Sequence, residues 1–434
     1  MQLTPEQKQF ILAHEREDIR ETALRFVRDD MPLLLTQIAG RQMAEKKIPS
    51  WYAETGVFYP PHLSLEQSSS ELTARYKASL VSEENGRSFT VVVTNQQSVE
   101  GRNDTFADLT SSVETTNPGS VEWKNKTFAD LTGGMGVDFS FLSPYFRKAF
   151  YVEQNKELCR IAEHNFQVLG LGNTTIYCAG AEHFLKETTP LDFIYLDPSR
   201  RDNSGRKLFR IEDCSPDLSE IKSLLLEKSD RVMVKYSPML DISLAVKTLR
   251  CVSAVHIVSV DNECKELLFL LSKTAVTEPL FVAVNLKQSG REERFLFTIT
   301  QEQETVVGFA SDPGRYLYEP NTSILKAGAF KSVAEAYSLQ KLHINSHLYT
   351  SDELVADFPG RVFEVETSFA PNKKNIKTFL QDTIKANIAV RNFPMTVAEI
   401  RRKIGLADGG NVYLFATTLA DGQKVWIICR KGIV

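Results

Sequence analysis

The sequence predicts an α/β protein built on a doubly wound, mostly parallel sheet of seven strands, with helices before the sheet and an α+β region after it. Between residues 127 and 273, seven short apolar runs alternate with helical spacers, which is the pattern of a parallel sheet covered on both faces. A glycine-rich loop follows the first run. The last two runs are separated only by "DNECK", which is too short for a crossover helix, so these two strands should pair antiparallel.

Composition limits the class of protein. A chain of 434 residues should form two or three domains. No apolar run approaches the roughly 18 residues that span a bilayer, and the N-terminus lacks the basic and apolar parts of a secretory signal. The six cysteines are scattered, without a C-x-x-C pair. These features predict a cytoplasmic protein with reduced thiols, no metal site and no membrane partner.

The N-terminal region is predicted to be helical. Thr4 is a helix N-cap, Pro5 takes the first helical position, and Gln7 completes a capping box. A further helix is expected within residues 64–80, where three serines supply the cap before Glu71. Between these two helices an apolar series recurs at helical spacing, formed by Ile19, Ala23, Leu24 and Val27.

Residues 83–126 are predicted to be a surface insertion, partly irregular, because they are rich in Ser, Thr, Asn and Glu and can bury little apolar surface. The phrase "FADLT" occurs here, at Phe106–Thr110, and again 22 residues later, at Phe128–Thr132. Only the second copy continues into glycines. Because a ligand approaches a backbone most closely where side chains are missing, we expect the second copy to be a site and the first to be a duplicated strand fragment.

A strand ending in Asp130 leads through "LTGGMG" into an apolar helix. Doubly wound sheets bind nucleotides at the carboxyl ends of their strands, and a helix N-terminus offers free N–H groups. The spacing of Gly133, Gly134 and Gly136 is not the dinucleotide fingerprint G-x-G-x-x-G. A carboxylate at the strand end repels a pyrophosphate but attracts an ammonium group. The loop therefore favours a ligand with an ammonium and a carboxylate, such as the methionine part of S-adenosylmethionine.

The second predicted strand ends at Glu153, 23 residues after Asp130. An acid at this place can accept hydrogen bonds from both hydroxyls of a ribose. A helix with one apolar face should follow, and Gly170 is expected to end it.

"DLTGGMG", "YVEQN" and "FIYLDPSRR", in this order, resemble motifs I, II and IV of class I S-adenosylmethionine-dependent methyltransferases. The resemblance covers roughly residues 64–273. It implies a seven-stranded sheet whose last strand is antiparallel, and S-adenosylmethionine as the cofactor. The cofactor-binding residues that it implies are Asp130, Thr132, Gly133, Gly134, Gly136 and Glu153.

The third predicted strand leads into "YCAGAEHFL". Where this family often has an acid that binds the adenine amine, the chain has Gly180. We expect Glu182, two residues later, to replace that acid as a cofactor-binding residue.

Asp197, Pro198, Ser199 and Arg200 follow the fourth predicted strand, which should lie beside the first. Methyltransferases that act on exocyclic amines usually have Asp/Asn-Pro-Pro-aromatic here, where the first side chain accepts the amine's hydrogens and the ring stacks on the flipped base. This chain keeps Asp-Pro but changes the last two positions, and all four residues are predicted to orient the acceptor. N-methylation is preferred to C-methylation, because no cysteine has the surroundings that covalent attack on a pyrimidine needs.

"YLYEPNTSILKAG" and the segment 392–431 are similar to a bacterial group of methyltransferases with a THUMP-like domain. THUMP modules are associated with RNA modification, so the resemblance implies RNA, either tRNA or rRNA, as the partner. The predicted domains are residues 1–82 (N-terminal helical region), 83–126 (insertion), 127–276 (methyltransferase domain), 277–370 (α+β, ferredoxin-like domain) and 371–434 (basic THUMP-like domain).

Charge supports a polyanionic partner. Residues 371–434 hold eleven lysines and arginines against four acids, a net charge of +7, whereas the whole chain carries −4. The predicted RNA-binding residues are Lys373, Lys374, Lys377, Arg401 and Arg402. Alternatively, these lysines only solvate a helix over "NIKTFLQDTIKANI", docked by its apolar residues Ile376, Phe379, Leu380, Ile384 and Ile388.

The predicted function is therefore an S-adenosylmethionine-dependent RNA methyltransferase. Two other functions stay open: a catalytically vestigial RNA-binding protein, and a methyltransferase of a small molecule or a protein. The sequence leaves the modified nucleotide and the oligomeric state open.

Overall fold

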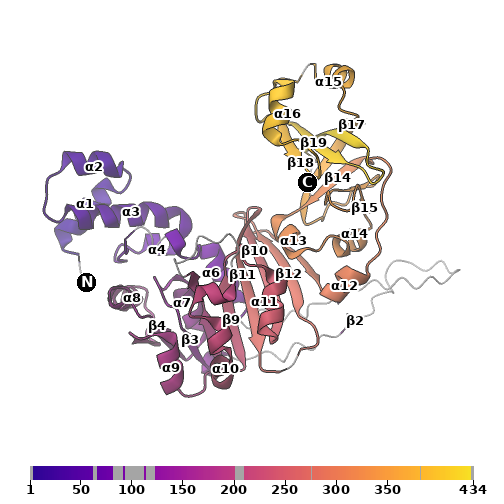
Figure 1. The fold of residues 1–434 in the computed structure, drawn as a ribbon. Helices are drawn as coiled ribbons and strands as arrows, with labels where there is room; N and C mark the ends of the chain where they lie inside the picture. The colour runs from indigo at the N-terminus through magenta and orange to yellow at the C-terminus, as the bar shows by residue number, and fades with distance from the viewer. Residues whose placement is uncertain are drawn as a thin grey trace. The chain divides into compact units, whose positions relative to one another are not determined.

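The computed structural model describes residues 3–61, 66–81, 91–92, 112–113, 123–200, 210–274, 276–381 and 383–431. The chain divides into two compact units, which Figure 1 shows in ribbon form. The first comprises Met1–Thr90, Ser112–Val255 and Glu266–Thr277, and the second comprises Val91–Ser111, His256–Lys265 and Glu278–Val434.

Helices open the first unit. The Thr4 hydroxyl accepts a hydrogen bond from the N–H of Gln7, and the Gln7 side chain accepts one from the N–H of Thr4, so the predicted capping box is confirmed. Ser70 caps the helix that begins at Glu71, as predicted. The helices are α1 (Pro5–His14), α2 (Ile19–Arg25), α3 (Met31–Lys47), α4 (Pro49–Ala53) and α6 (Glu71–Ser79).

The apolar series predicted from Ile19 to Val27 does not form one buried face. Helix α2 ends at Arg25, and Leu24 and Val27 are 87% and 100% exposed. The chain becomes extended at Phe26, whose ring packs edge-on against the ring of Phe10. Leu24 lies within α2, as its spacing predicts, whereas the prediction for Val27 is wrong because the helix ends before it.

Among the described residues, β5, β4, β3, β6, β9, β11 and β10 are neighbours in that order within a sheet of nine strands, two more than the seven predicted. β3 pairs parallel with both β4 and β6, and Asp130 lies opposite Tyr151 on one side and Tyr195 on the other. The carboxyl ends of these three strands therefore meet at one edge. The strands are β3 (Thr127–Asp130), β4 (Lys148–Val152), β5 (Thr174–Tyr177), β6 (Phe193–Leu196), β9 (Arg231–Tyr236), β10 (Val252–Val260) and β11 (Glu263–Ser272).

The hairpin of β10 and β11 follows β9 in this strand order. Asp261 and Asn262 join the two strands with φ values of 47° and 68°, as a tight two-residue turn requires. β11 pairs antiparallel with β9, with Leu267 opposite Tyr236. The predicted hairpin and the predicted antiparallel last strand are confirmed.

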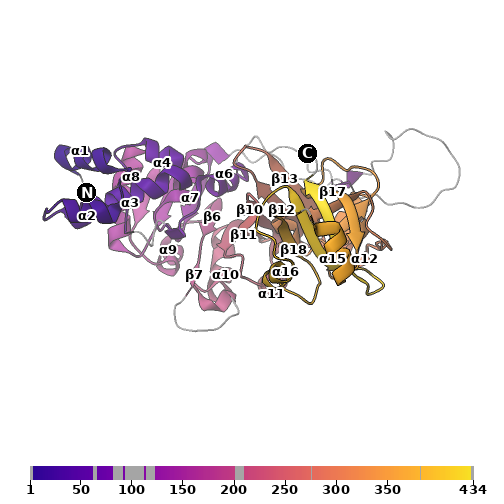
Figure 2. The ribbon, with the colours of Figure 1, turned by 90° about the horizontal axis from the view of Figure 1, so that it is seen from above.

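Helices cover both faces of this sheet. Figure 2 shows α6, α7 and α8 over one face and α9, α10 and α11 over the other. Asn155 caps α8, and Gly170 follows its end with a φ of 70°. This is the predicted doubly wound arrangement. The helices that follow α6 are α7 (Val137–Leu142), α8 (Lys156–Val168), α9 (Ala181–Glu187), α10 (Leu218–Lys228) and α11 (Ile242–Leu249).

The N-terminal helices pack onto α7, the helix that follows the glycine loop. Trp51 is buried in a cluster with Tyr59, Met135 and Val137. Its indole N–H donates to the hydroxyl of Ser140 at 3.2 Å. The N-terminal region therefore belongs to the same compact unit as the sheet.

The second unit contains two further groups of strands. β12 (Leu280–Leu286) and β13 (Glu292–Phe297) pair antiparallel and follow β10 in the nine-stranded sheet. A separate sheet has the order β15-β16-β14-β17-β20-β19-β18. Its strands are β14 (Tyr316–Pro320), β15 (Gln340–Lys341), β16 (Tyr349–Ser351), β17 (Gly360–Phe369), β18 (Asn387–Val390), β19 (Val412–Thr418) and β20 (Lys424–Lys431).

This second sheet buries apolar side chains on both faces. Phe415 and Ile427 belong to one cluster, and Leu414 and Trp426 to another, because successive side chains of a strand alternate between faces. A hairpin joins β19 and β20, with Thr418 opposite Lys424. The helices of the unit are α12 (Ile299–Glu304), α13 (Thr322–Ala327), α14 (Ser332–Ala336), α15 (Lys373–Leu380) and α16 (Val397–Ile404).

The helix expected over "NIKTFLQDTIKANI" is shorter than predicted. It ends at Leu380, which is buried beside Trp426. Ile384 is 79% exposed, and Ile388 lies in β18, which pairs parallel with β19. The prediction of one helix through Ile388 is wrong, because residues 387–390 make their backbone hydrogen bonds to a neighbouring strand.

The predicted insertion, residues 83–126, lies almost wholly outside the described residues, as does the first "FADLT". Within it the structure describes β1 (Val91–Val92), β2 (Ser112–Val113) and the residues from Trp123 onward. The insertion and the domain boundaries stay predictions.

Candidate active site

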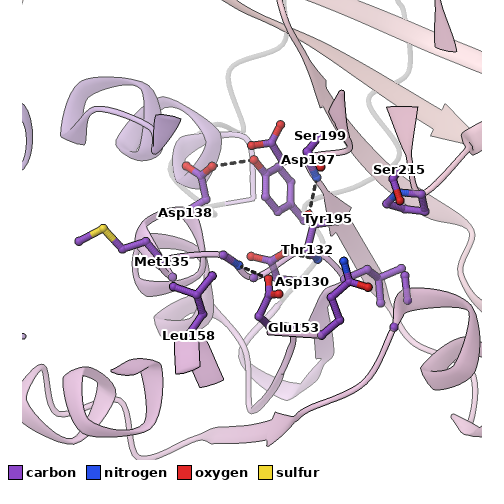
Figure 3. Close-up of a pocket in the computed structure, with 18 of the residues that line it drawn as sticks. Asp130, Thr132, Met135, Asp138, Glu153, Leu158, Tyr195, Asp197, Ser199 and Ser215 are labelled. Atoms are coloured by element: carbon purple, nitrogen blue, oxygen red, sulfur yellow. Dashed lines mark hydrogen bonds between the residues drawn. The ribbon is translucent and has the colours of Figure 1, made fainter. Parts of the chain in front are cut away.

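A cavity of about 640 Å³ opens at the carboxyl ends of β3, β4 and β6. The loop after β3, the end of β4, the start of α9 and the residues after β6 line it, and Figure 3 shows their side chains. The cavity brings together all seven predicted cofactor-binding residues with Asp197 and Ser199, two of the four predicted acceptor-orienting residues. Those seven are Asp130, Thr132, Gly133, Gly134, Gly136, Glu153 and Glu182.

The loop after β3 requires glycine at three positions. Gly134 and Gly136 have φ values of 54° and 86°, which residues with a side chain rarely adopt. A Cβ atom at Gly133 would lie 2.2 Å from Cε2 of Tyr151, and one at Gly136 would lie 2.7 Å from Cζ of Phe166. Packing against two aromatic rings therefore holds the loop down on the sheet, a requirement that the sequence motif does not reveal.

Asp130 ends β3 and is 1% exposed. Its Oδ1 accepts a hydrogen bond from the N–H of Thr132 at 3.0 Å. Burial raises the pKa of Asp130 well above its usual value; the Thr132 hydrogen bond opposes this, while the carboxylates of Asp138, Asp197 and Glu153 reinforce it. A positively charged ligand group beside Asp130 would relieve this repulsion.

Glu153 joins the loops that follow β3 and β4. Its Oε2 accepts the backbone N–H of Gly134 at 2.9 Å, the contact dashed in Figure 3. Its Oε1 accepts the N–H of Asn155 at 2.7 Å. The hydroxyl of Tyr151 donates to the carbonyl of Gly134, so the loop is held by a side chain on each side.

Gly180 and Glu182 both line the cavity. Gly180 is the N-cap of α9 and provides no side-chain cap. A Cβ atom there would meet nothing within 4 Å, so this wall is open where the related proteins often place an acid. Glu182 lies in the first turn of α9, close in sequence to the open wall. That Glu182 replaces this acid as a cofactor-binding residue stays a prediction.

Asp197 is held at both its backbone and its side chain. Its N–H donates to the hydroxyl of Thr132 at 2.6 Å, which ties the end of β6 to the glycine loop. Its Oδ2 lies 2.5 Å from Nζ of Lys235. Pro198 is buried, and the next two residues form β7 (Ser199–Arg200), which pairs antiparallel with β8 (Cys214–Ser215). The side chain of Arg200 lies outside the described part of the chain.

A network of buried charged groups lies beside the cavity. The ammonium group of Lys77 donates to both carboxylate oxygens of Glu266, at 2.7 and 2.8 Å, and lies 3.2 Å from Oδ1 of Asp138. The hydroxyls of Tyr195 and Ser69 donate to Oδ2 of Asp138, at 2.6 and 2.8 Å. Helix α6 is thereby connected to the first turn of α7 and to β11.

Sequence reasoning missed this network. Lys235 and Glu266 each interrupt an apolar strand run, "RVMVKY" and "ELLFLL". A charged residue in such a run is rarely buried without a partner, so both could have been identified as paired. Lys77 lies in a helix 189 residues from Glu266, and no local signal identifies it.

The surrounding charges favour the ionised forms of Asp138 and Lys235. Burial raises the pKa of Asp138, but Lys77, Lys235 and two hydroxyl donors outweigh burial and lower it below the usual value. Burial lowers the pKa of Lys235, but the carboxylates around it, Asp197 first, raise it above its usual value.

The predicted RNA-binding residues lie in the second unit. Lys373, Lys374 and Lys377 are exposed on α15, and Arg402 is exposed on α16. Arg401 is engaged within the protein. Its guanidinium lies 2.5 Å from Oδ1 of Asp408 and donates to the carbonyls of residues 386 and 406. Both helices contribute to the cluster around Trp426, and Figure 1 shows them at the same end of their sheet.

In the described part of the chain, no three His, Cys, Asp or Glu side chains are grouped so that they could hold a metal ion. The described helices also include none with the length and apolar character needed to cross a membrane.

Comparison with known proteins identifies two domains by sequence. Residues 316–359 match a ferredoxin-like domain, and residues 360–431 match a THUMP domain-like family. Together these segments form the second sheet, from β14 to β20. No protein of curated function matches the chain.

Solved structures resemble the chain at two levels. A protein of Porphyromonas gingivalis W83, described as a "putative methyltransferase", is 29% identical, with a TM-score of 0.81 and full coverage of both chains. A Streptococcus mutans protein solved in complex with SAH is 18% identical over 36% of this chain and 92% of that one, with a TM-score of 0.28. An rRNA methylase of Streptococcus thermophilus is 16% identical over 35% and 89%, with a TM-score of 0.27.

The full-length likeness agrees with the doubly wound sheet, and the two domain matches cover the separate sheet of the second unit. The chain therefore has a methyltransferase fold with a THUMP-like domain over residues 360–431, as its sequence predicts.

Proposed function

We propose that this protein is an S-adenosylmethionine-dependent methyltransferase that acts on RNA in the cytoplasm and methylates a nitrogen of a base. One observation carries the proposal. Asp130, the glycine loop and Glu153, which would bind the cofactor, line the same cavity as Asp197, which would orient the acceptor. The full-length relative described as a methyltransferase supports the same activity.

The cavity fits this cofactor chemically. Asp130, Glu153 and Asp197 make its wall acidic, which suits a ligand whose sulfonium and ammonium groups outweigh one carboxylate. Asp130 would bind the ammonium group, and Glu153, at the end of β4, would accept the ribose hydroxyls. The cofactor supplies a methyl group already activated by the sulfonium, so the protein has mainly to position the acceptor and exclude water.

Nitrogen is the favoured acceptor because Asp197 can accept a hydrogen bond from an N–H group. Among the described residues that line the cavity there is no cysteine, whereas methyl transfer to a pyrimidine carbon uses a cysteine nucleophile. Ser199 lies at the same wall and could contact the acceptor. Pro198 and Arg200 continue the same turn, and we retain them as acceptor-orienting residues.

RNA is the favoured substrate because the basic C-terminal segment matches a THUMP-like family. The exposed lysines of α15 and Arg402 of α16 would contact phosphates, which position an RNA without reading its sequence. Arg401 would act indirectly, since its guanidinium holds Asp408.

A second candidate function is RNA binding without catalysis. The open wall at Gly180 and the altered positions Ser199 and Arg200 favour it, because each departs from the family pattern. Methylation of a small molecule or a protein is a third candidate, in which the basic segment has no role in substrate choice.

Two experiments test these functions. Calorimetric titration with S-adenosylmethionine and S-adenosylhomocysteine should show binding of both; failure to bind either would contradict the methyltransferase proposal. Transfer of tritiated methyl groups to separate RNA, protein and small-molecule fractions should label RNA. Label in another fraction would overturn the RNA assignment, and cofactor binding without any transfer would favour the vestigial protein.

A further inference from the structure

The ion pair between Asp197 and Lys235 occupies the edge of the sheet where the acceptor would bind. Leu196 of β6 lies opposite Val234 of β9 in a parallel pair, so the next residue of each strand, Asp197 and Lys235, emerges at the same carboxyl edge. Nζ of Lys235 lies 2.5 Å from Oδ2 of Asp197. The Lys235 side chain is 11% exposed, whereas that of Asp197 is 37% exposed and lines the cavity. The lysine is therefore behind the carboxylate, and the carboxylate faces the ligand space.

We propose that Lys235 is a positioning residue of the methyl-transfer site: it holds one oxygen of Asp197 and so presents the other oxygen, as a carboxylate, to an N–H group of the acceptor. This inference rests on the proposed function. The backbone N–H of Asp197 is already bound to the hydroxyl of Thr132 at 2.6 Å. With both the backbone and one carboxylate oxygen held, little freedom remains to be lost when the acceptor binds.

The arrangement matches the proton balance of N-methylation. As the acceptor nitrogen bonds to the methyl carbon, the carbon–sulfur bond breaks and its electron pair goes to sulfur. The nitrogen then carries one hydrogen too many, and that proton passes to Asp197 and from there to water. A carboxylate can accept the hydrogen bond and the proton, whereas a protonated carboxyl group has already used one of its oxygens as a donor.

The surroundings of Asp197 explain why a buried lysine is needed. The ionisable groups around the pair are Asp130 of β3, Asp138 of α7, Lys77 of α6, Tyr195 of β6 and Tyr236 of β9 near Asp197, and Glu266 of β11 near Lys235. Lys77 is already bound to two of these acids. Burial raises the pKa of Asp197 and nearby Asp138 adds to this, while Lys235 is the strongest opposing influence. Without Lys235, the carboxyl group would bind a proton more readily.

Stability alone does not account for such a pair. Replacing a buried ion pair by apolar residues is often neutral or stabilising, because desolvation offsets the attraction between the charges. Strongly perturbed ionisable groups that line a cavity are more typical of functional sites. A purely structural pair would affect the melting temperature but not the ionisation of a reacting group.

The test compares Lys235→Met, which removes the charge, with Lys235→Arg, which retains it. The matched control is Lys222→Met, because Lys222 is a half-buried lysine of the same unit whose ammonium group donates to the carbonyl of Leu249 at 3.0 Å. Two quantities are measured in the full-length protein. One is the pH dependence of tritiated methyl transfer to RNA, and the other is the pKa of Asp197 from carbon-13 NMR of aspartate-labelled protein, assigned with Asp197→Asn.

We expect Lys235→Met to move the acid limb of the rate profile and the pKa of Asp197 upward together, by about one pH unit or more. Lys235→Arg should restore most of the shift, and Lys222→Met should behave as the parent. In the Asp197→Asn background, Lys235→Met should cause little further loss of rate, because the lysine acts through Asp197. This double variant also removes the unpaired charge that could prevent Lys235→Met from folding.

The positioning role would be overturned if the pKa of Asp197 were unchanged in Lys235→Met. It would also be overturned if Lys235→Arg shifted that pKa as much as Lys235→Met does. Additive losses of rate in the double variant would also overturn it. If the parent transfers no methyl group to any fraction, the proposed function fails, while the NMR titration still decides whether Lys235 controls the ionisation of Asp197.

Discussion

The carboxylate of Glu153, after β4, accepts the backbone N–H of Gly134, in the loop after β3, at 2.9 Å. This contact joins two loops at the carboxyl edge of the sheet, 19 residues apart in the chain. The acid expected to bind a ribose is therefore already oriented by the loop expected to surround the methionine part of the ligand.

Replacing Glu153 by Gln should weaken S-adenosylmethionine binding by about tenfold or more, because hydrogen bonds to a charged group contribute about 1.5–3 kcal/mol each. The amide keeps the shape and can still accept from Gly134, so the melting temperature should change little. Calorimetry measures the affinity. Glu157→Gln, at an exposed acid in the first turn of α8, is the control and should bind as the parent does. Equal affinities of all three proteins would contradict the role of Glu153.

Asp130→Ala should abolish cofactor binding, whereas Asp108→Ala, in the first "FADLT", should leave it intact. The reason is that, of the two copies in the sequence, only that of Asp130 precedes a glycine loop, and Asp130 lines the cavity. Asp108 lies outside the described residues. Titration of each folded variant with S-adenosylmethionine is the measurement, with circular dichroism to confirm folding. Loss of affinity in both variants alike would show that the repeat has been interpreted wrongly.

Gly133→Ala should destabilise the protein by about 1–3 kcal/mol, the usual cost of overpacking, because the new methyl group would lie 2.2 Å from the ring of Tyr151. The matched control is Gly180→Ala in the same cavity, where a Cβ atom meets nothing within 4 Å and φ is −73°. This control should change stability by less than about 0.5 kcal/mol. Thermal unfolding measures both, and equal effects would contradict the packing argument.

Binding of S-adenosylmethionine should strengthen as pH rises and then level off. Burial and the neighbouring acids raise the pKa of Asp130 well above its usual value, so below that pKa the carboxyl group of the free site carries a proton that the ligand's ammonium group must displace. Calorimetry in buffers of different ionisation enthalpy should detect release of a proton on binding below that pKa. Asp130→Asn should remove the release; a parent protein that releases none would contradict the prediction.

The stability of the ligand-free protein should also depend on the ionisation of Asp130, but it should decrease as pH rises. A carboxyl group whose pKa is raised by folding contributes stability that is fully present below its unfolded pKa of about 3.9 and is lost as pH rises through the folded pKa. The melting temperature of Asp130→Asn relative to the parent should therefore increase with pH. A constant difference across this range would show that Asp130 does not titrate.

Reversing the charges of Lys373, Lys374 and Lys377 to Glu should weaken binding to tRNA and to unrelated RNA alike. The slope of log affinity against log salt should become shallower by about 2, since each lost phosphate contact removes about 0.7 to 0.9. The control reverses three exposed lysines of the first unit, Lys8, Lys46 and Lys247. S-adenosylmethionine binding should be unchanged in both. An unaltered salt slope in the first variant would mean that these lysines only solvate α15.

Local features of this protein were readable from its sequence. The capping box at Thr4, the alternation of strands and helices, the hairpin at Asp261 and the glycine loop after Asp130 each depend on residues adjacent in the chain. The seven predicted cofactor-binding residues lie at or after strand ends, and the carboxyl ends of parallel strands meet at one edge, so their convergence on one cavity could also be predicted.

Tertiary structure alone decided which charges are paired. Lys77 and Glu266 are joined across 189 residues, and Lys235 meets Asp197 because β6 and β9 pair in a particular register. The same is true of Gly133, whose missing side chain is explained by the ring of Tyr151 on the neighbouring strand. Periodicity and turn residues record short-range backbone preferences, whereas ion pairs and close packing depend on strand register and side-chain reach between distant segments, which no local pattern specifies.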